Sequence, residues 1–282
     1  MASNPDSAAA ATATATAVVH PSWHAAARDG SEDLLRIGED QTHYIAEWPG
    51  RLTQRVSKAT HESELFWQAA LPARARAKFL AGPVRAFERH ARGALSFHGG
   101  AMALDGMAIC VLGVSGAGKS TCVYDACTRG PWTFVADDVS HVDLTDVAAR
   151  VHSTELVAAL THQSVLHFGL CATGDPKLLL DAPETRLAAA PLKAFVDLAF
   201  GDSEELHLAP LKGLQAVGAL MASQVRLVLA SISVHAHDMD AIERLLARVP
   251  VLRLTRPRAL GRLAQAESLL AKWVQEQGER VP

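Results

Sequence analysis

The sequence predicts a protein of the α/β class. Short apolar runs of strand length alternate with longer stretches in which apolar residues recur at helical spacing. Near the middle of the chain, a glycine-rich loop separates an apolar run from a helical stretch. The chain has 282 residues, of which 49% are hydrophobic and 20% are charged. It can therefore bury a sizeable core, and this composition excludes global disorder.

Changes in composition predict three parts along the chain. Residues 1–17 end in a low-complexity run of alanine and threonine, which cannot supply a packed face, so we expect a disordered tail. Residues 18–72 are expected to form an N-terminal extension of mixed structure, with a short strand at Tyr44–Trp48. Residues 73–282 are expected to form the principal domain.

The principal domain is expected to begin with a helix over Ala73–Arg92. We expect a break at Gly82-Pro83, because proline lacks a backbone donor and clashes with the preceding turn. We interpret the basic residues of this helix as a solvated face, the alternative being an electropositive rim that attracts an anionic partner. They are Arg74, Arg76, Lys78, Arg85, Arg89 and Arg92.

The remaining elements follow from apolar periodicity. The expected strands are Ala94–Phe97, Met107–Leu112, Trp132–Ala136, Ala194–Phe200, Val225–Val234 and Val251–Leu254. The expected helices are Lys119–Thr128, Met239–Arg248 and Leu260–Gln275.

Charge and cysteine content narrow the function classes. A formal net charge of -3 provides no basic surplus for phosphate backbones, which argues against a nucleic-acid binder. No lysine or arginine precedes Arg28, and no apolar run approaches the roughly 20 residues that span a bilayer. We therefore expect a cytoplasmic protein with no membrane partner. The cysteines are interpreted as reduced thiols because they lack metal-site spacing: Cys110, Cys122, Cys127 and Cys171.

The glycine-rich loop carries the strongest functional signal. Residues 113–120 read Gly-Val-Ser-Gly-Ala-Gly-Lys-Ser and match the phosphate-binding pattern G-x-x-x-x-G-K-[ST] between a strand and a helix. Lys119 is expected to reach the β- and γ-phosphates of a nucleotide, and Ser120 to ligate Mg²⁺. The alternative is a strand–helix turn without a ligand. The expected nucleotide-contacting residues are Gly113, Val114, Ser115, Gly116, Ala117, Gly118, Lys119, Ser120 and Thr121.

Three further polar residues are candidates for chemistry. Asp137-Asp138 ends an apolar strand, where one carboxylate is placed to hold Mg²⁺ and the other to accept a proton from an attacking hydroxyl. Adjacent side chains on a strand point to opposite faces, so a shared task requires the chain to bend there. His98 follows another apolar run and is suited either to contact a phosphate or to a structural role.

These features together resemble the catalytic domain of HPr kinase/phosphorylase and its kinase-only relatives. The resemblance covers roughly residues 75–145 and is carried by His98-Gly99, the turn Asp105-Gly106, the loop at 113–120, the helix ending at Arg129-Gly130 and the strand ending at Asp137-Asp138.

The resemblance implies a P-loop fold related to phosphoenolpyruvate carboxykinase, with ATP and Mg²⁺ as cofactors. It implies that Lys119 contacts the phosphates and that Ser120 binds the metal. Asp138 would accept the proton of the substrate hydroxyl, Asp137 would support the metal or the base, and His98 would lie beside the reacting phosphate.

A departure from the family pattern points to the kinase-only relatives. The bifunctional members carry a Glu-x-Arg-Gly-x-Gly segment downstream, and no such segment occurs in this chain. Some stand-alone relatives phosphorylate a serine in a ribosomally made peptide, such as a lasso-peptide precursor. In this comparison Glu155 is a candidate substitute metal ligand, and Lys177 or Arg186 a candidate cap on the transferred phosphate. The resemblance also implies a homo-oligomer.

The sequence thus predicts an ATP- and Mg²⁺-dependent kinase that phosphorylates a hydroxyl, most simply serine, on a peptide or small protein. Two alternatives remain at this level. One is a non-catalytic binding switch controlled by ATP occupancy. The other is a small-molecule kinase, which the same motifs would serve.

Overall fold

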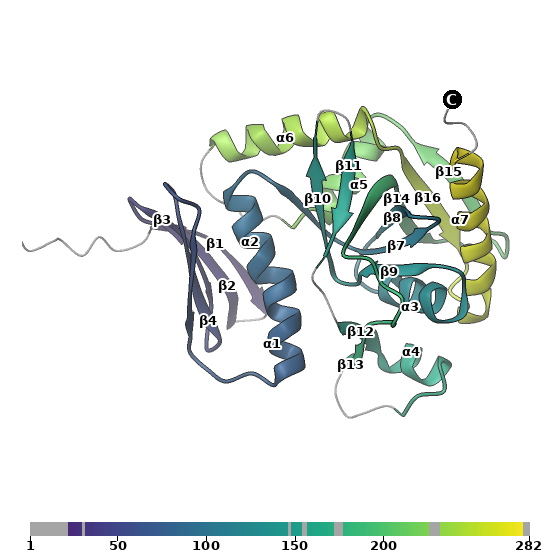
Figure 1. Ribbon diagram of the computed structural model, residues 1–282, viewed down its shortest axis with the longest axis horizontal. Coiled ribbons are helices and arrows are strands. Elements are labelled where there is room, and N and C mark those ends of the chain that lie inside the picture. Colours follow the sequence, from purple (N-terminus) through teal and green to yellow (C-terminus); the bar gives the residue numbers. More distant parts are fainter. Residues whose placement is uncertain are drawn as a thin grey trace, which may run out of the picture.

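The computed structural model describes residues 22–29, 32–145, 148–153, 157–171, 177–225 and 232–278. The expected tail at residues 1–17 and the candidate ligand Glu155 lie outside these ranges. Figure 1 shows a small sheet on one side, a helical segment beside it, and a larger sheet flanked by helices. This architecture confirms the predicted α/β class. In the described residues, no helix has both the length and the apolar character needed to cross a membrane.

The small sheet is antiparallel, and its strands lie in chain order. They are β1 (Ser22–Asp29), β2 (Glu32–Glu39), β3 (His43–Trp48), β4 (Leu52–Ser57) and β5 (Ser63–Trp67). The predicted strand at Tyr44–Trp48 is confirmed as β3. In β4 alternate residues are buried, and these include Gln54, whose amide donates to the backbone oxygen of Val84 at 3.2 Å. One face of the sheet therefore packs against the following helical segment.

That helical segment is continuous, so the expected break at Gly82-Pro83 is wrong. It consists of α1 (Ala73–Phe79), a π-helical turn η1 (Leu80–Val84) and α2 (Arg85–Ala91). The wider π turn accommodates Pro83, whose missing N–H would otherwise interrupt an α-helix. Phe87 and Val84 pack with residues of the small sheet in one buried cluster.

The larger sheet is mixed, and nine strands form it in the described part of the chain. They are β6 (Leu95–His98), β7 (Gly100–Leu104), β8 (Met107–Leu112), β9 (Thr133–Ala136), β10 (Val139–Leu144), β11 (Ala149–His152), β14 (Ala189–Phe200), β15 (His207–Leu211) and β16 (Val251–Arg256). The order is β6-β10-β11-β14-β8-β7-β9, with β16 between β14 and β15. Strands β8 and β16 both run parallel to β14.

Strand direction brings several strand ends to one edge of this sheet. Strand β9 runs antiparallel to β7, which runs antiparallel to β8, so β9 shares the direction of β8. The carboxyl ends of β8, β9, β14 and β16 therefore lie at the same edge, where ligands of α/β proteins commonly bind.

Helices cover both faces of the larger sheet. They are α3 (Lys119–Arg129), α5 (Leu214–Ser223), α6 (Ile232–Leu246) and α7 (Leu263–Gly278), which follows the short 3₁₀ turn η2 (Leu260–Arg262). Cys110 and Leu112 of β8 belong to the core with α5 and α6, whereas Ile109 and Val111 belong to the core with α3 and α7. This alternation places buried side chains on both faces of β8, which explains its uninterrupted apolar sequence.

A small hairpin lies below the larger sheet in Figure 1. It comprises β12 (Val157–Thr161) and β13 (Lys177–Asp181), with α4 (His162–His167) following β12. The expected strand Val225–Val234 is wrong at the positions that the structure describes, because Val225 lies outside any strand and residues 232–234 begin α6. Residues 226–231 are outside the described ranges. Periodicity alone cannot distinguish a short apolar run of this kind from a helix.

The basic residues of the α1–α2 segment do not form a uniform solvated face. Arg89 is buried and donates to the Asp143 carboxylate at 2.6 Å and to the backbone oxygen of Val142 at 3.0 Å. Lys78 is also turned inward, with a side chain only 13% exposed. Arg74 and Arg92 remain exposed, as expected. Two basic side chains, Lys78 and Arg89, therefore attach the segment to the larger sheet.

A buried histidine joins the helical segment to the larger sheet. His141 of β10 is 1% exposed, and its Nε2 lies 3.0 Å from the backbone oxygen of Ala81. A carbonyl can only accept, so Nε2 carries the hydrogen and Nδ1 accepts from the Ser96 hydroxyl at 2.9 Å. Burial lowers the pKa of His141 to about 4, with the nearby Arg89 acting in the same direction. The folded protein therefore holds this ring neutral.

We expect His141 to make stability fall in weak acid. Between pH 6.5 and 4 the unfolded chain protonates this ring while the folded chain does not, so its contribution is complete above pH 6.5 and is lost as pH falls. The resulting decrease in the free energy of unfolding should approach about 3 kcal/mol. Urea unfolding at several pH values should show a steeper decline for wild type than for His141→Gln. The exposed His162→Gln is the control, and an unchanged slope in His141→Gln would contradict the assignment.

Candidate functional site

The loop between β8 and α3 owes its shape to its glycines. Gly113, Gly116 and Gly118 have φ angles of 136°, 82° and 88°, a region that residues with a Cβ rarely adopt. A Cβ on Gly113 would also lie 2.8 Å from the backbone oxygen of Leu198 on β14. The chain therefore curls tightly at the end of β8 and enters α3 at Lys119, which leaves the first N–H groups of that helix facing the loop.

Lys119 is folded back over this loop. Its ammonium group donates to the backbone oxygens of Gly113 at 2.8 Å and Val114 at 3.3 Å. Burial lowers the pKa of Lys119, while the negative charge of Asp138 opposes the shift and Lys177 adds to it. Both of these carbonyls are neutral acceptors. A negatively charged oxygen that enters the loop can therefore replace them as the hydrogen-bond partner of the ammonium.

The loop opens into a cavity of about 370 Å³. Of the sequence-predicted site residues, the structure brings His98, Ser115, Gly116, Gly118, Lys119, Ser120, Thr121 and Asp138 to its lining. Gly113, Val114, Ala117 and Asp137 are not among the lining residues. Val114 is 75% exposed, Gly113 is half-buried, and Ala117 and Asp137 are buried. Lys177 also lines the cavity, whereas Arg186 does not.

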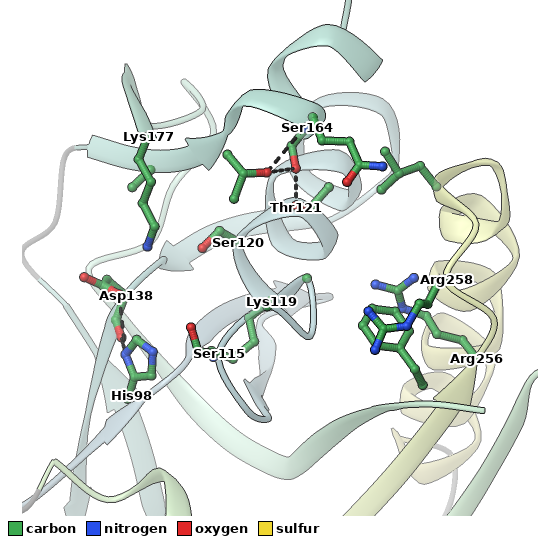
Figure 2. Close-up of a pocket in the computed structure, with 17 residues that line it drawn as sticks. His98, Ser115, Lys119, Ser120, Thr121, Asp138, Ser164, Lys177, Arg256 and Arg258 are labelled. Atoms are coloured by element: carbon green, nitrogen blue, oxygen red, sulfur yellow. Dashed lines mark hydrogen bonds and ion pairs between the residues drawn. The ribbon is translucent and has the colours of Figure 1, made fainter. Parts of the chain in front are cut away.

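Hydroxyl groups form one wall of the cavity. The Thr121 hydroxyl lies 2.7 Å from that of Ser164, which lies 3.0 Å from the hydroxyl of Thr161 (Figure 2). Thr161 also caps α4 by accepting from the backbone N–H of Ser164. This chain of hydrogen bonds attaches α3 to the β12–β13 hairpin and so fixes the wall against the loop.

Asp138 and His98 meet at one end of the cavity. The His98 Nδ1 lies 3.1 Å from the backbone oxygen of Asp138 and 3.4 Å from its carboxylate (Figure 2). Burial lowers the pKa of His98, as does the charge of Lys119, and Asp138 partly opposes them. The side chains of His98 and Asp138 are 47% and 31% exposed. A carboxylate and an imidazole are therefore both accessible beside the loop.

Asp137 is not among the residues that line the cavity and is 1% exposed. Its carboxylate accepts the backbone N–H of Ala159 at 2.7 Å and lies 3.3 Å from the Lys78 ammonium. Lys78 also lies 3.8 Å from the Asp138 carboxylate. The chain bends at these two residues, so both carboxylates lie near one ammonium group, although only Asp138 lines the cavity. Sequence reasoning missed the role of Lys78, which pairs with both carboxylates.

Arg256 is a second residue that sequence reasoning missed. It ends β16, is 2% exposed, and donates to the backbone oxygen of Ala117 at 3.1 Å and of Pro257 at 3.3 Å. A Cβ on Gly118 would lie 2.5 Å from its guanidinium. Arg256 therefore holds the loop from behind and adds positive charge to the cavity, whose lining it joins.

Comparison with known proteins gives remote structural likenesses, one of which is described here. The chain is similar to the Hpr(Ser) kinase/phosphatase from Coxiella burnetii, with a TM-score of 0.38 and 14% sequence identity over 65% of this chain and 98% of that chain. No protein-family model matches the chain, and no curated protein sequence matches it. A likeness this remote says nothing about activity.

The contact between Gly118 and Arg256 can be tested by a matched pair of variants. In Gly116→Ala the added Cβ meets no atom within 4 Å. The free energy of unfolding should therefore fall only by the roughly 1–2 kcal/mol that a left-handed backbone costs a residue with a Cβ. Gly118→Ala has the same backbone strain and must also displace Arg256, which should cost about 1–3 kcal/mol more. Urea denaturation measures both losses. Equal losses would show that Arg256 does not restrain the loop.

Proposed function

We propose that the protein is an ATP- and Mg²⁺-dependent phosphotransferase with a fold of the HPr kinase and phosphoenolpyruvate carboxykinase type. The observation that carries the proposal is the position of Asp138, an accessible carboxylate in the same cavity as the loop that matches the phosphate-binding pattern. A phosphate-binding loop needs no carboxylate to hold a nucleotide. A carboxylate beside the transferred phosphate is what proton removal from an acceptor hydroxyl requires.

The residues of the cavity fit a bound Mg²⁺. This ion prefers oxygen ligands, is usually held by few protein groups, and takes its remaining ligands from phosphates and water. The Ser120 hydroxyl lies in the cavity beside the loop and is the proposed protein ligand. Asp137, behind the cavity, has the indirect role of fixing Asp138 and the strand end. When bound, the metal neutralises charge on the phosphates.

The proposed reaction uses the chain's own groups mainly for positioning and charge. The loop amides and Lys119 hold the phosphates, with Lys119 exchanging the carbonyls of Gly113 and Val114 for phosphate oxygens. Asp138 takes the proton of the acceptor hydroxyl as its oxygen bonds to the γ-phosphorus. The bond from that phosphorus to the bridging oxygen breaks, and ADP leaves. His98 lies beside Asp138 and orients it through the 3.4 Å contact.

We propose a hydroxyl on a peptide or small protein, most simply serine, as the acceptor. The exposure of Asp138 and His98 supports this choice, because a chain segment can reach an open reacting end. Arg74, on α1, pairs with Asp181 of the hairpin at 2.7 Å and lies at the surface between the two elements. A ribosomally made peptide is the narrower version of this proposal.

Asp138→Asn should bind ATP with near wild-type affinity and lose at least about 100-fold in transfer, because the amide cannot accept the proton. Transfer of label from γ-labelled ATP with Mg²⁺ into a protein and peptide extract of the source cell measures the activity and reports the acceptor by mass. Near wild-type transfer by Asp138→Asn would remove this residue from the reaction.

Two further variants complete the experiment. Lys119→Ala should lose both nucleotide binding and transfer. Asp105→Asn changes a carboxylate in an exposed turn with a φ of 51°, a conformation that asparagine also adopts, and should leave both nucleotide binding and transfer unchanged. Wild-type protein that binds ATP without labelling any acceptor would favour the binding-switch alternative.

A further inference from the structure

The cavity has two chemically different ends. Figure 2 places His98 and Asp138 at one end and Arg256 and Arg258 at the other, with the loop between them. Among the described residues that line the cavity, Asp138 is the only carboxylate. The end distant from Asp138 is therefore cationic and, with Phe200 and Leu260, partly apolar.

The strands of the larger sheet fix this distant end. Phe200 is the last residue of β14, and Arg256, the last residue of β16, is its register partner in the parallel pair. Arg258 follows two residues later. The side chains are thus positioned by two hydrogen-bonded strands, at the same sheet edge as the loop after β8.

The two arginines have different surroundings. Their guanidinium carbons lie 4.9 Å (Arg256) and 4.3 Å (Arg258) from the centre of the Phe200 ring. Arg256 is buried and bonded to the backbone oxygens of Ala117 and Pro257. Arg258 is exposed, and the described part of the chain gives it no hydrogen bond or ion pair. Its planar cation therefore stacks on Phe200 and remains available to a ligand.

The proposed function determines which part of a ligand reaches this end. Transfer places the γ-phosphate at Asp138, and the loop holds the phosphate chain. The nucleoside then lies on the side of the loop away from Asp138. A nucleobase is flat and aromatic, and bases stack well on guanidinium and aromatic surfaces. An acceptor hydroxyl, in contrast, must approach the Asp138 end.

We propose that Arg258, supported by Phe200, forms the nucleobase subsite of the cavity. The base stacks on the guanidinium plane of Arg258, and Leu260 adds an apolar edge. This inference rests on the proposed function, because it assumes that the loop binds a nucleoside triphosphate.

A comparison of two ligands tests the subsite. Adenosine 5′-(β,γ-imido)triphosphate carries a base, whereas inorganic tripolyphosphate has a phosphate chain alone. Calorimetry with Mg²⁺ on the full chain should show that Arg258→Ala weakens binding of the nucleotide roughly 5- to 30-fold, as expected for loss of one stacked base. Binding of tripolyphosphate should change less than about twofold, because the subsite does not touch it.

Matched variants separate stacking from charge. Arg258→Lys keeps the positive charge without the guanidinium plane, so it should also weaken nucleotide binding and spare tripolyphosphate. Phe200→Leu should act in the same direction through loss of the supporting ring. Arg262→Ala, which removes a cation that is not among the lining residues and donates to the backbone oxygen of Glu204, should affect neither ligand.

The remaining outcomes overturn the inference. Equal weakening of both ligands by Arg258→Ala would make Arg258 a phosphate contact, and unchanged nucleotide affinity would leave it without a role in binding. In both cases the wild-type chain binds nucleotide, so the proposed function stands. A wild-type chain that binds neither ligand would instead overturn the proposed function and the subsite together.

Discussion

The structure of the site depends on one buried carboxylate. Asp137 is 1% exposed, and such a charge is tolerated in a protein interior only with close partners. It has them in the N–H of Ala159 on β12 and the ammonium of Lys78 on α1. Because each of these elements is held to the end of β9, the neighbouring Asp138 has a fixed position at the cavity. The interaction also links the cavity to the small sheet, against which the α1–α2 segment packs.

Arg256 provides the matching constraint on the other side of the loop. Its guanidinium reaches Ala117 from the end of β16, a strand separated from the loop by more than a hundred residues in sequence. The loop is thus held by its own glycine conformations and by a cation placed behind it. A loop fixed in this way needs little reorganisation when a phosphate binds, and pre-organised donors interact more strongly than donors that must first be ordered.

The sequence allowed the loop, Asp138 and His98 to be predicted because their signals are local. The loop pattern encodes its own backbone shape, and a carboxylate at a strand end needs only the strand to place it. Lys78 and Arg256 carry no such signal, since a lysine on a helix and an arginine at a strand end acquire their roles only through tertiary contacts. The small sheet was largely missed for a similar reason: β4 buries Gln54, which interrupts the apolar alternation by which strands are recognised.

The charges around the cavity determine which kind of ligand the loop favours. Lys119, Lys177, Arg256 and Arg258 all line it, opposed by the single carboxylate of Asp138 among the described lining residues. Lys119 and Arg256 satisfy their charges with backbone oxygens of the loop, and Arg258 stacks on Phe200. An entering polyphosphate would exchange the carbonyl partners of Lys119 for charged oxygens, and hydrogen bonds between two ionised groups are the stronger kind. The arrangement therefore favours an anion, and the two buried cations of the lining, Lys119 and Arg256, are hydrogen-bonded to the loop itself.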